Sequence, residues 1–294
     1  MNGFVAGYLP LFDLYLLHLG MAFSQYIVLR AGVFSLASAA FAGIGAYTAG
    51  ILAVSAGLHP VLGLGAGLLA GMLAGLVLSI PLARLRGVYQ AIATVAFIQI
   101  VLSLNIYSDS LTGGAMGLNG IPKTVGTGTL LLAALGTIYL IWSLERGRVG
   151  RAFSAIRQDE AVAASLGVSI TWYQALAFAL SGALAGLFGG LEAYHSYALD
   201  PNQFGFHLLI TLLSYVILGG RNSVWGPIIG TAILILLPEI ARPLAENRMI
   251  MHGIILIVVI NYLPKGIVDT WIDWIKARRL GTAGSGQDKG GAAS

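Results

Sequence analysis

Long apolar stretches recur along almost the whole chain, and they limit its fold more than any other feature. Most hold about 17 to 25 residues, enough for an α-helix rising about 1.5 Å per residue to cross about 30 Å of hydrocarbon. A β-barrel would show shorter strands of alternating polarity. We therefore expect an all-α, polytopic transmembrane helical bundle of about eight or nine spans. The expected spans are residues 9–29, 33–56, 61–82, 89–107, 128–144, 172–194, 206–220, 224–240 and 250–264.

The composition excludes a soluble enzyme. Hydrophobic residues make up 57% of the chain and charged residues 10%, against roughly 25% charged residues in soluble domains. The chain has no cysteine, which excludes disulfides and thiolate metal sites. The second and seventh spans could be re-entrant or broken helices, because glycine and serine are frequent near residues 35–50 and the apolar run before Gly219 is short.

Basic residues predict the orientation of the bundle. With residues 145–171 placed in the cytoplasm, all of the 16 Lys and Arg residues except Lys123, Arg242 and Arg248 fall on the cytoplasmic side. The positive-inside rule then predicts an N-terminus outside and a C-terminus in the cytoplasm. This distribution by membrane side also argues against a nucleic-acid partner. No Lys or Arg precedes Arg30, so we expect the first apolar stretch to remain as a helix rather than a cleaved signal.

The chain divides into three parts by composition. Residues 1–264 form the expected transmembrane domain, which contains a polar cytoplasmic segment at 148–171. Residues 265–280 combine Trp271 and Trp274 with charged residues, a pattern typical of a helix at the membrane surface. Residues 281–294 have no apolar periodicity and are expected to be disordered.

Two spans carry ridges of small residues at a spacing of four. Such ridges let helix backbones approach closely, and in lipid this packing drives helix association. We interpret them as packing seams, within the protein or between subunits; the alternative is a solute path lined by backbone. The ridge residues are Gly63, Gly67, Gly71 and Gly75 in the third span and Gly182, Gly186 and Gly190 in the sixth.

The segment 148–171 interrupts the apolar pattern with a short polar helix. Phe153, Ile156, Ala163 and Leu166 are expected to share one face, and Gly167 to end the helix in a left-handed conformation. Arg157 and Glu160 stand at i, i+3. A helix held between two spans offers a soluble partner something rigid to push, although it could also be a surface helix that only joins them.

The same segment carries a resemblance to a known family. It is similar to the cytoplasmic coupling segment of permeases of branched-chain amino-acid ABC transporters, where the loop docks on the ATPase, and the order of motifs resembles the second of the two permease types. The similar stretches cover most of residues 30–240. They read GRAFSAIRQDEAVAASLGV, ALAFALSGALAGLFGGLEAY, PNQFGFHLLITLLSYVILGGRNSVWGPIIGTAILILLPE, FSLASAAFAGIGAYTAG, RLRGVYQAIATVAF and TGGAMGLNGIP.

The resemblance implies a permease subunit in the bacterial cytoplasmic (inner) membrane. Its partners would be a second homologous permease subunit, two cytoplasmic ATPase subunits and an extracytoplasmic solute-binding protein, within the lipid bilayer. Met116 and Asn222 depart from the usual family pattern, and Met116 weakens a direct transfer of substrate preference. The implied ATPase-coupling residues are Gly150, Arg151, Ala155, Ile156, Arg157, Asp159, Glu160, Ala163, Ala164 and Gly167.

Catalysis on this chain is not expected. A phosphate-binding P-loop needs a Gly-Lys pair, and the sequence contains none. We therefore expect no cofactor on this chain, with ATP and Mg²⁺ held by the partner ATPases. The five histidines lack metal-ligand spacing and are interpreted as interfacial or packing residues.

The solute path is expected along uncharged polar groups. The acidic residues Asp13, Glu192 and Glu239 lie near the expected membrane edges, where water or headgroups can reach them. The candidates in the spans could instead form hydrogen bonds between helices. These candidates are Ser35, Ser38, Gln90, Thr94 and Gln99.

Other functions remain possible at this point. The chain could be a secondary transporter or channel that works alone, although such proteins place ionisable residues or broken helices at mid-membrane. A membrane scaffold would leave the coupling-like segment without a role. Within the ABC class, the solute could be leucine, isoleucine or valine, or else urea, a short amide or an aromatic acid.

Overall fold

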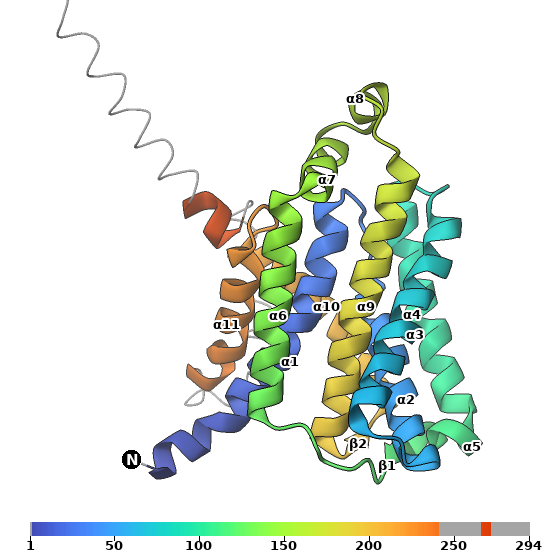
Figure 1. The fold of residues 1–294 in the computed structure, drawn as a ribbon, viewed down its shortest axis with the longest axis vertical. Coiled ribbons are helices and arrows are strands. Elements are labelled where there is room, and N and C mark those ends of the chain that lie inside the picture. The colour runs from blue at the N-terminus through green and yellow to red at the C-terminus, as the bar shows by residue number, and fades with distance from the viewer. Residues whose placement is uncertain (1, 241–265, 272–294) are drawn as a thin grey trace, which may run out of the picture. The chain divides into compact units, whose positions relative to one another are not determined.

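The computed structural model describes residues 2–240 and 266–271, with the backbone alone at 2–7 and 238–240. The chain forms two compact units, Met1–Ser214 and Tyr215–Ser294 (Figure 1). The α-helices are α1 (Asn2–Arg30), α2 (Ser38–Ala56), α3 (Pro60–Leu82), α4 (Val88–Tyr107), α5 (Asp109–Thr112), α6 (Thr127–Arg146), α7 (Arg148–Gln158), α8 (Glu160–Ser165), α9 (Ile170–Ser196), α10 (Phe206–Gly219) and α11 (Trp225–Ile240).

The helices match the spans expected from hydropathy. Seven described helical segments are long and apolar enough to cross a membrane, and α11 is a shorter apolar helix. The first eight expected spans coincide with α1, α2, α3, α4, α6, α9, α10 and α11, with ends shifted by a few residues. The all-α polytopic bundle is therefore confirmed for the described residues. The ninth span, the tail and most of 265–280 lie outside them, although 267–271 are helical.

Helix α9 forms the centre of the first unit. It packs along α3 on one side and α1 on the other, and α2 also lies against it (Figure 1). Its buried residues include the small residues Ser181, Gly182, Ala185 and Gly189, which leave room for neighbouring backbones. The core is therefore built on close helix contacts, as expected where lipid supplies no hydrophobic drive for helix association.

The two glycine ridges face each other between α3 and α9. A Cβ atom on Gly71 would overlap the carbonyl oxygen of Gly182, and a Cβ on Gly182 would overlap that of Gly71. A Cβ on Gly186 would likewise overlap the carbonyl oxygen of Gly67, whereas a Cβ on Gly67 would overlap that of Gly45 on α2. At the ends of the seam, a Cβ on Gly75 would overlap the carbonyl oxygen of Phe178. The ridges thus form a packing seam inside this chain.

The second span begins later than hydropathy suggests. Helix α2 is continuous from Ser38, so it is neither broken nor re-entrant, but residues 33–37 before it form no helix. Gly32 turns the chain at the end of α1 with a left-handed φ of 81°, which glycine adopts without strain. Residues 33–37 then run into the bundle, and only Phe34 among them is exposed. Non-helical backbone at this depth is tolerated only where protein surrounds it.

Short elements gather at one end of the first unit, called here the sheet end. Strand β1 (Leu118–Asn119) pairs antiparallel with β2 (Ala198–Leu199). Two 3₁₀ turns, η1 (Gly114–Met116) and η2 (Pro201–Phe204), flank the strands. Hydropathy did not predict these elements, because each holds only two to four residues.

The opposite end, called the α7 end, carries the basic residues of the first unit except Lys123. Arg30 ends α1, and Arg84 and Arg86 lie in the link between α3 and α4. An ion pair of 3.7 Å between Arg86 and Glu160 places this link beside α8. Lys123 lies after β1, toward the sheet end. The expected separation of charge by side is therefore present in this unit.

Candidate functional site

The polar segment between α6 and α9 forms two helices instead of the single helix expected. Helix α7 ends at Gln158, and Asp159 adopts an extended conformation with φ −159°. The Asp159 carboxylate accepts hydrogen bonds from the backbone N–H groups of Ala161 and Val162, at 2.8 and 3.0 Å. An aspartate that caps a helix in this way starts a new helix, which explains the break. Figure 1 shows α7 above the ends of α1 and α6, with α8 farther out.

Because of the break, some apolar residues of the segment face the bundle and others face outward. Phe153, Ile156 and Ala163 are each at most 2% exposed, as expected for an inner face. Leu166, expected on the same face, is 75% exposed, and Val162 is 55% exposed. The prediction for Leu166 was wrong because it assumed one helical register through Asp159. Helix α8 therefore presents an apolar tip, Val162 and Leu166, to the surroundings.

The expected left-handed end of α8 is present. Gly167 has φ 82°, and its N–H donates to the carbonyl of Ala164 at 3.0 Å. The N–H of Val168 donates to the carbonyl of Ala163 at 3.1 Å. These bonds close the last turn of α8 and direct the chain back toward α9.

Helix α7 is fixed against α1 and α6 through backbone contacts. A Cβ on Gly150 would overlap the carbonyl oxygen of Glu145, so the turn between α6 and α7 needs glycine there. A Cβ on Gly32 would lie 3.2 Å from Cα of Arg157, which places the end of α1 directly against α7. With no side chain between them, a displacement of α7 cannot be absorbed by side-chain rotation at these two points.

Glu145 ties the same corner together with polar contacts. Its carboxylate accepts a hydrogen bond from the Tyr26 hydroxyl and lies 3.4 Å from the Nε of Arg30. Glu160 has a similar place at the start of α8, where it accepts a hydrogen bond of 3.4 Å from Gln174 of α9 besides its ion pair with Arg86. Arg157 and Glu160 therefore lie on different helices rather than three residues apart on one.

The ten residues assigned to coupling by resemblance do not form one surface. Some lie inside the corner, whereas others face outward, where another protein could reach them. Val162 and Leu166, the two exposed apolar side chains of this segment, are not among the ten. The buried members are Gly150, Ile156 and Ala163; the partly exposed ones are Ala155, Arg157 and Glu160; the exposed ones are Arg151, Asp159, Ala164 and Gly167.

Four of the five candidate path residues are buried and hydrogen-bonded within the chain. Ser38 donates to the side-chain oxygen of Gln25 at 2.8 Å, and the Gln25 amide donates to the carbonyl of Ser35 at 2.7 Å. The Thr94 hydroxyl accepts from the N–H of Leu36 at 3.1 Å. These contacts give hydrogen-bond partners to the carbonyl of Ser35 and the N–H of Leu36 in the buried, non-helical segment 33–37. Gln25, missed in the sequence, is central to this network.

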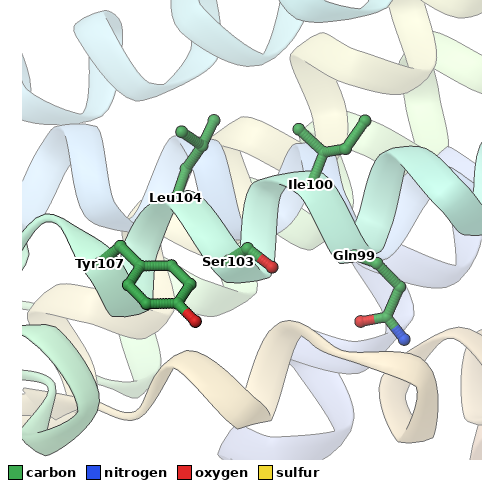
Figure 2. A pocket seen from close by; sticks show the side chains of 5 residues that line it. All are labelled: Gln99, Ile100, Ser103, Leu104 and Tyr107. Atoms are coloured by element: carbon green, nitrogen blue, oxygen red, sulfur yellow. The ribbon is translucent and has the colours of Figure 1, made fainter.

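The fifth candidate, Gln99, lies on the face of α4 opposite to Gln90 and Thr94. Gln90, like Thr94, is on the buried face of α4, and its amide donates to the carbonyl of Leu82 at 3.3 Å. Gln99 is exposed instead, and it lines a hollow of about 350 Å³ on the outer face of α4 (Figure 2). The other lining residues are Ile100, Ser103, Leu104 and Tyr107.

The acidic residues expected at membrane edges differ in their surroundings. Asp13 is only 7% exposed, contrary to the expectation that water or headgroups reach it. Its Oδ2 lies 3.8 Å from Nε2 of His195 on α9, whose other ring nitrogen contacts the carbonyl of Val125. Glu192 is partly exposed, and the Glu239 side chain lies outside the described residues. The pairing of α1 with α9, which hydropathy cannot predict, buries Asp13.

Met116 and Asn222, the two residues that depart from the family pattern, both lie outside α7 and α8. Met116 stands at the end of η1 and is 92% exposed, at the sheet end of the first unit. In the second unit, the N–H of Asn222 donates to Asp269 at 3.0 Å. Over residues 2–240 and 266–271, no group of three or more His, Asp or Glu side chains could hold a metal ion.

Comparison with known proteins gives consistent matches to one kind of membrane protein. The chain is 30% identical to the high-affinity branched-chain amino acid transport system permease protein LivM of Salmonella typhimurium, over 90% of this chain and 69% of that protein. It is also 30% identical to LivM of Escherichia coli, over 82% of this chain and 65% of that protein. The permease protein LivH of Escherichia coli is 28% identical over 48% of this chain.

Matches at the level of the family extend over most of the chain. No solved structure matches this one significantly. The family described as branched-chain amino acid transport system / permease component matches residues 9–260. Together with the seven apolar helical segments that are long enough to cross a membrane, these matches identify a multi-pass integral membrane protein. The chain belongs to the branched-chain amino acid transport system permease family.

Proposed function

We propose that the chain is the permease subunit of an ABC importer that moves branched-chain amino acids, or similar small solutes, across the bacterial cytoplasmic membrane. Membership of the family and the similarity to LivM support this function. The complete importer would contain a second permease chain, two ATPases that bind ATP and Mg²⁺, and an extracytoplasmic solute-binding protein. The similarity to both LivM and LivH, each named as a permease of such a system, favours a partner that is related but not identical.

The observation that carries the proposal is the apolar tip of α8 on a fixed base. Val162 and Leu166 are exposed, whereas Phe153 and Ile156 hold the segment to the bundle. Exposed apolar side chains on a polar segment are typical of a protein interface. The arginines at the α7 end favour a cytoplasmic location for this tip. We therefore assign the tip as the surface that docks on an ATPase.

The fixed base gives the tip a mechanical role. Movement of a docked ATPase would displace α8 and, through the short link at Asp159, α7. The contacts of α7 with Gly32 and Glu145 are to backbone, so the displacement would reach the ends of α1 and α6. In this scheme the buried coupling residues transmit the movement, and the exposed ones, with Val162 and Leu166, receive it.

The substitution Leu166→Glu tests the docking role. It places a charge on an exposed side chain, so the fold should be retained, whereas an apolar interface position should lose at least about 2 kcal/mol of docking energy. We expect loss of ATP-driven uptake in proteoliposomes that contain the complete importer, with normal membrane insertion. Ala83→Glu is the matched control, since Ala83 is exposed in the α3–α4 link at the same end.

Normal uptake by Leu166→Glu would contradict the assignment. Uptake by the isolated chain without nucleotide would instead favour a transporter that works alone. The solute is identified separately, by measuring which amino acid, amide or aromatic acid the cognate binding protein retains.

A further inference from the structure

The outer face of α4 differs from an ordinary lipid-facing surface. The outer face of α3 is entirely apolar, with Leu69 and Leu73 among its exposed residues at 51% and 57%. The outer face of α4 instead exposes Gln99, Ser103 and Tyr107. An unpaired amide in hydrocarbon costs about 2 to 7 kcal/mol, so lipid is an unfavourable environment for Gln99.

None of these three polar groups is satisfied inside the described chain. Thr137 on α6 donates its hydroxyl to the carbonyl four residues earlier, as hydroxyl side chains in membrane helices often do. Ser103 makes no such bond, and neither Gln99 nor Tyr107 has a hydrogen-bond partner among residues 2–240 and 266–271. Their donors and acceptors therefore remain available to something outside the chain.

The three polar residues form a line with an apolar line beside it. Gln99, Ser103 and Tyr107 are spaced by four residues and so follow one side of the helix over about 12 Å. Ile100 and Leu104 are 56% and 61% exposed and point to the other side (Figure 2). The hollow that these residues line is shallow and open, with a volume of about 350 Å³, so it is one side of a site and needs a second surface to enclose a ligand.

We propose that this face of α4 lines one side of the solute path, and that the solute it contacts is a small zwitterion with a branched apolar side chain. The amide and hydroxyl groups can exchange hydrogen bonds with an ammonium and a carboxylate, while Ile100 and Leu104 contact the apolar part. No charged side chain is among the described residues that line the hollow, so the solute can pass them without being held by an ion pair. This inference rests on the proposed function, because the opposite wall would come from the second permease.

The opposite face of α4 explains why the other candidates do not line the path. Gln90 and Thr94 are buried against the end of α3 and the segment 33–37. They hold α4 to the bundle, and their polar groups are already bonded. The three candidates on α4 therefore divide between its two faces, and among them Gln99 is the one whose side chain is exposed.

Cysteine labelling tests the proposal, because this chain has no native cysteine. Gln99→Cys and Ser103→Cys are compared with Leu73→Cys and Leu69→Cys, which lie at similar distances along α3 from the α7 end. Each variant is assembled into the complete importer and treated with a charged, membrane-impermeant thiosulfonate. The α4 positions should react at least about tenfold faster, because the reagent needs water and an ionised thiol. Saturating solute-loaded binding protein should change their rate.

A second experiment, on Gln99→Leu, distinguishes a residue that lines the solute path from one that faces lipid. Gln99→Leu should lower ATP-driven uptake about five- to tenfold, the effect of one hydrogen bond, with normal assembly. Labelling as slow as at Leu69 and Leu73, or normal uptake by Gln99→Leu, would overturn the proposal provided that the wild-type importer shows ATP-driven uptake. Absence of that uptake would refute the proposed function instead.

Discussion

The glycine seam between α3 and α9 permits a sharp test, the substitution Gly71→Ala. The added Cβ would overlap the carbonyl oxygen of Gly182 and lie 3.0 Å from Cα of Gly186. Both neighbours are backbone atoms, so no side chain can rotate away and the two helices must separate. Overpacking of this kind costs about 1 to 3 kcal/mol, offset by up to about 1 kcal/mol from the better helix propensity of alanine. The net loss of about 1 to 2 kcal/mol would raise the unfolding equilibrium constant, the ratio of unfolded to folded protein, by roughly 5- to 30-fold.

The control for this prediction lies on the same helix. A Cβ on Gly65 would meet no heavy atom within 4 Å, so Gly65→Ala should be neutral or slightly stabilising. The measurement is equilibrium unfolding of the purified protein in detergent, followed by circular dichroism. Gly71→Ala and Gly182→Ala act on one contact, so the double variant should cost less than the sum. Equal stability of Gly71→Ala and Gly65→Ala would refute a close-packed seam.

Two further predictions concern hydrogen bonds between one side chain and the backbone. Thr94→Val should destabilise the protein by about 1 to 3 kcal/mol, because it leaves the buried N–H of Leu36 without its acceptor, whereas Thr94→Ser should retain most of the stability; thermal unfolding in detergent compares them. Asp159→Ala should weaken α8 by about 1 kcal/mol and speed hydrogen exchange at Ala161 and Val162, and Asp159→Asn should restore protection; unchanged exchange in Asp159→Ala would contradict the capping role.

Most of the fold was predictable because membrane spans depend on length and apolarity alone. The ends of α3, α4 and α9 lie within about two residues of the expected spans. Residues 33–37 were not separated from α2, since a buried extended segment is as apolar as the helix that follows. What distinguishes it is the support from Gln25 and Thr94, which are distant in sequence.

The candidate site was less predictable, for reasons of geometry. A capping carboxylate at Asp159 reset the helical register, so the outward direction of Leu166 could not follow from periodicity. Polar residues on one helix also could not be divided between its faces without knowing the neighbours of α4. Gln90 and Gln99 have the same side chain, and only the packing of α2 and α3 distinguishes the bonded amide from the exposed one.

The seam of backbone against backbone also restricts how this protein can change shape. Because Gly45 approaches Gly186 as closely as Gly71 approaches Gly182, α2, α3 and α9 interlock at these four glycines through backbone contacts. Small sliding motions, which need side chains to repack, are expensive at such a surface. We expect these three helices to behave as a stationary frame during transport. The alternation between outward and inward access would then depend on the more loosely packed helices around that frame.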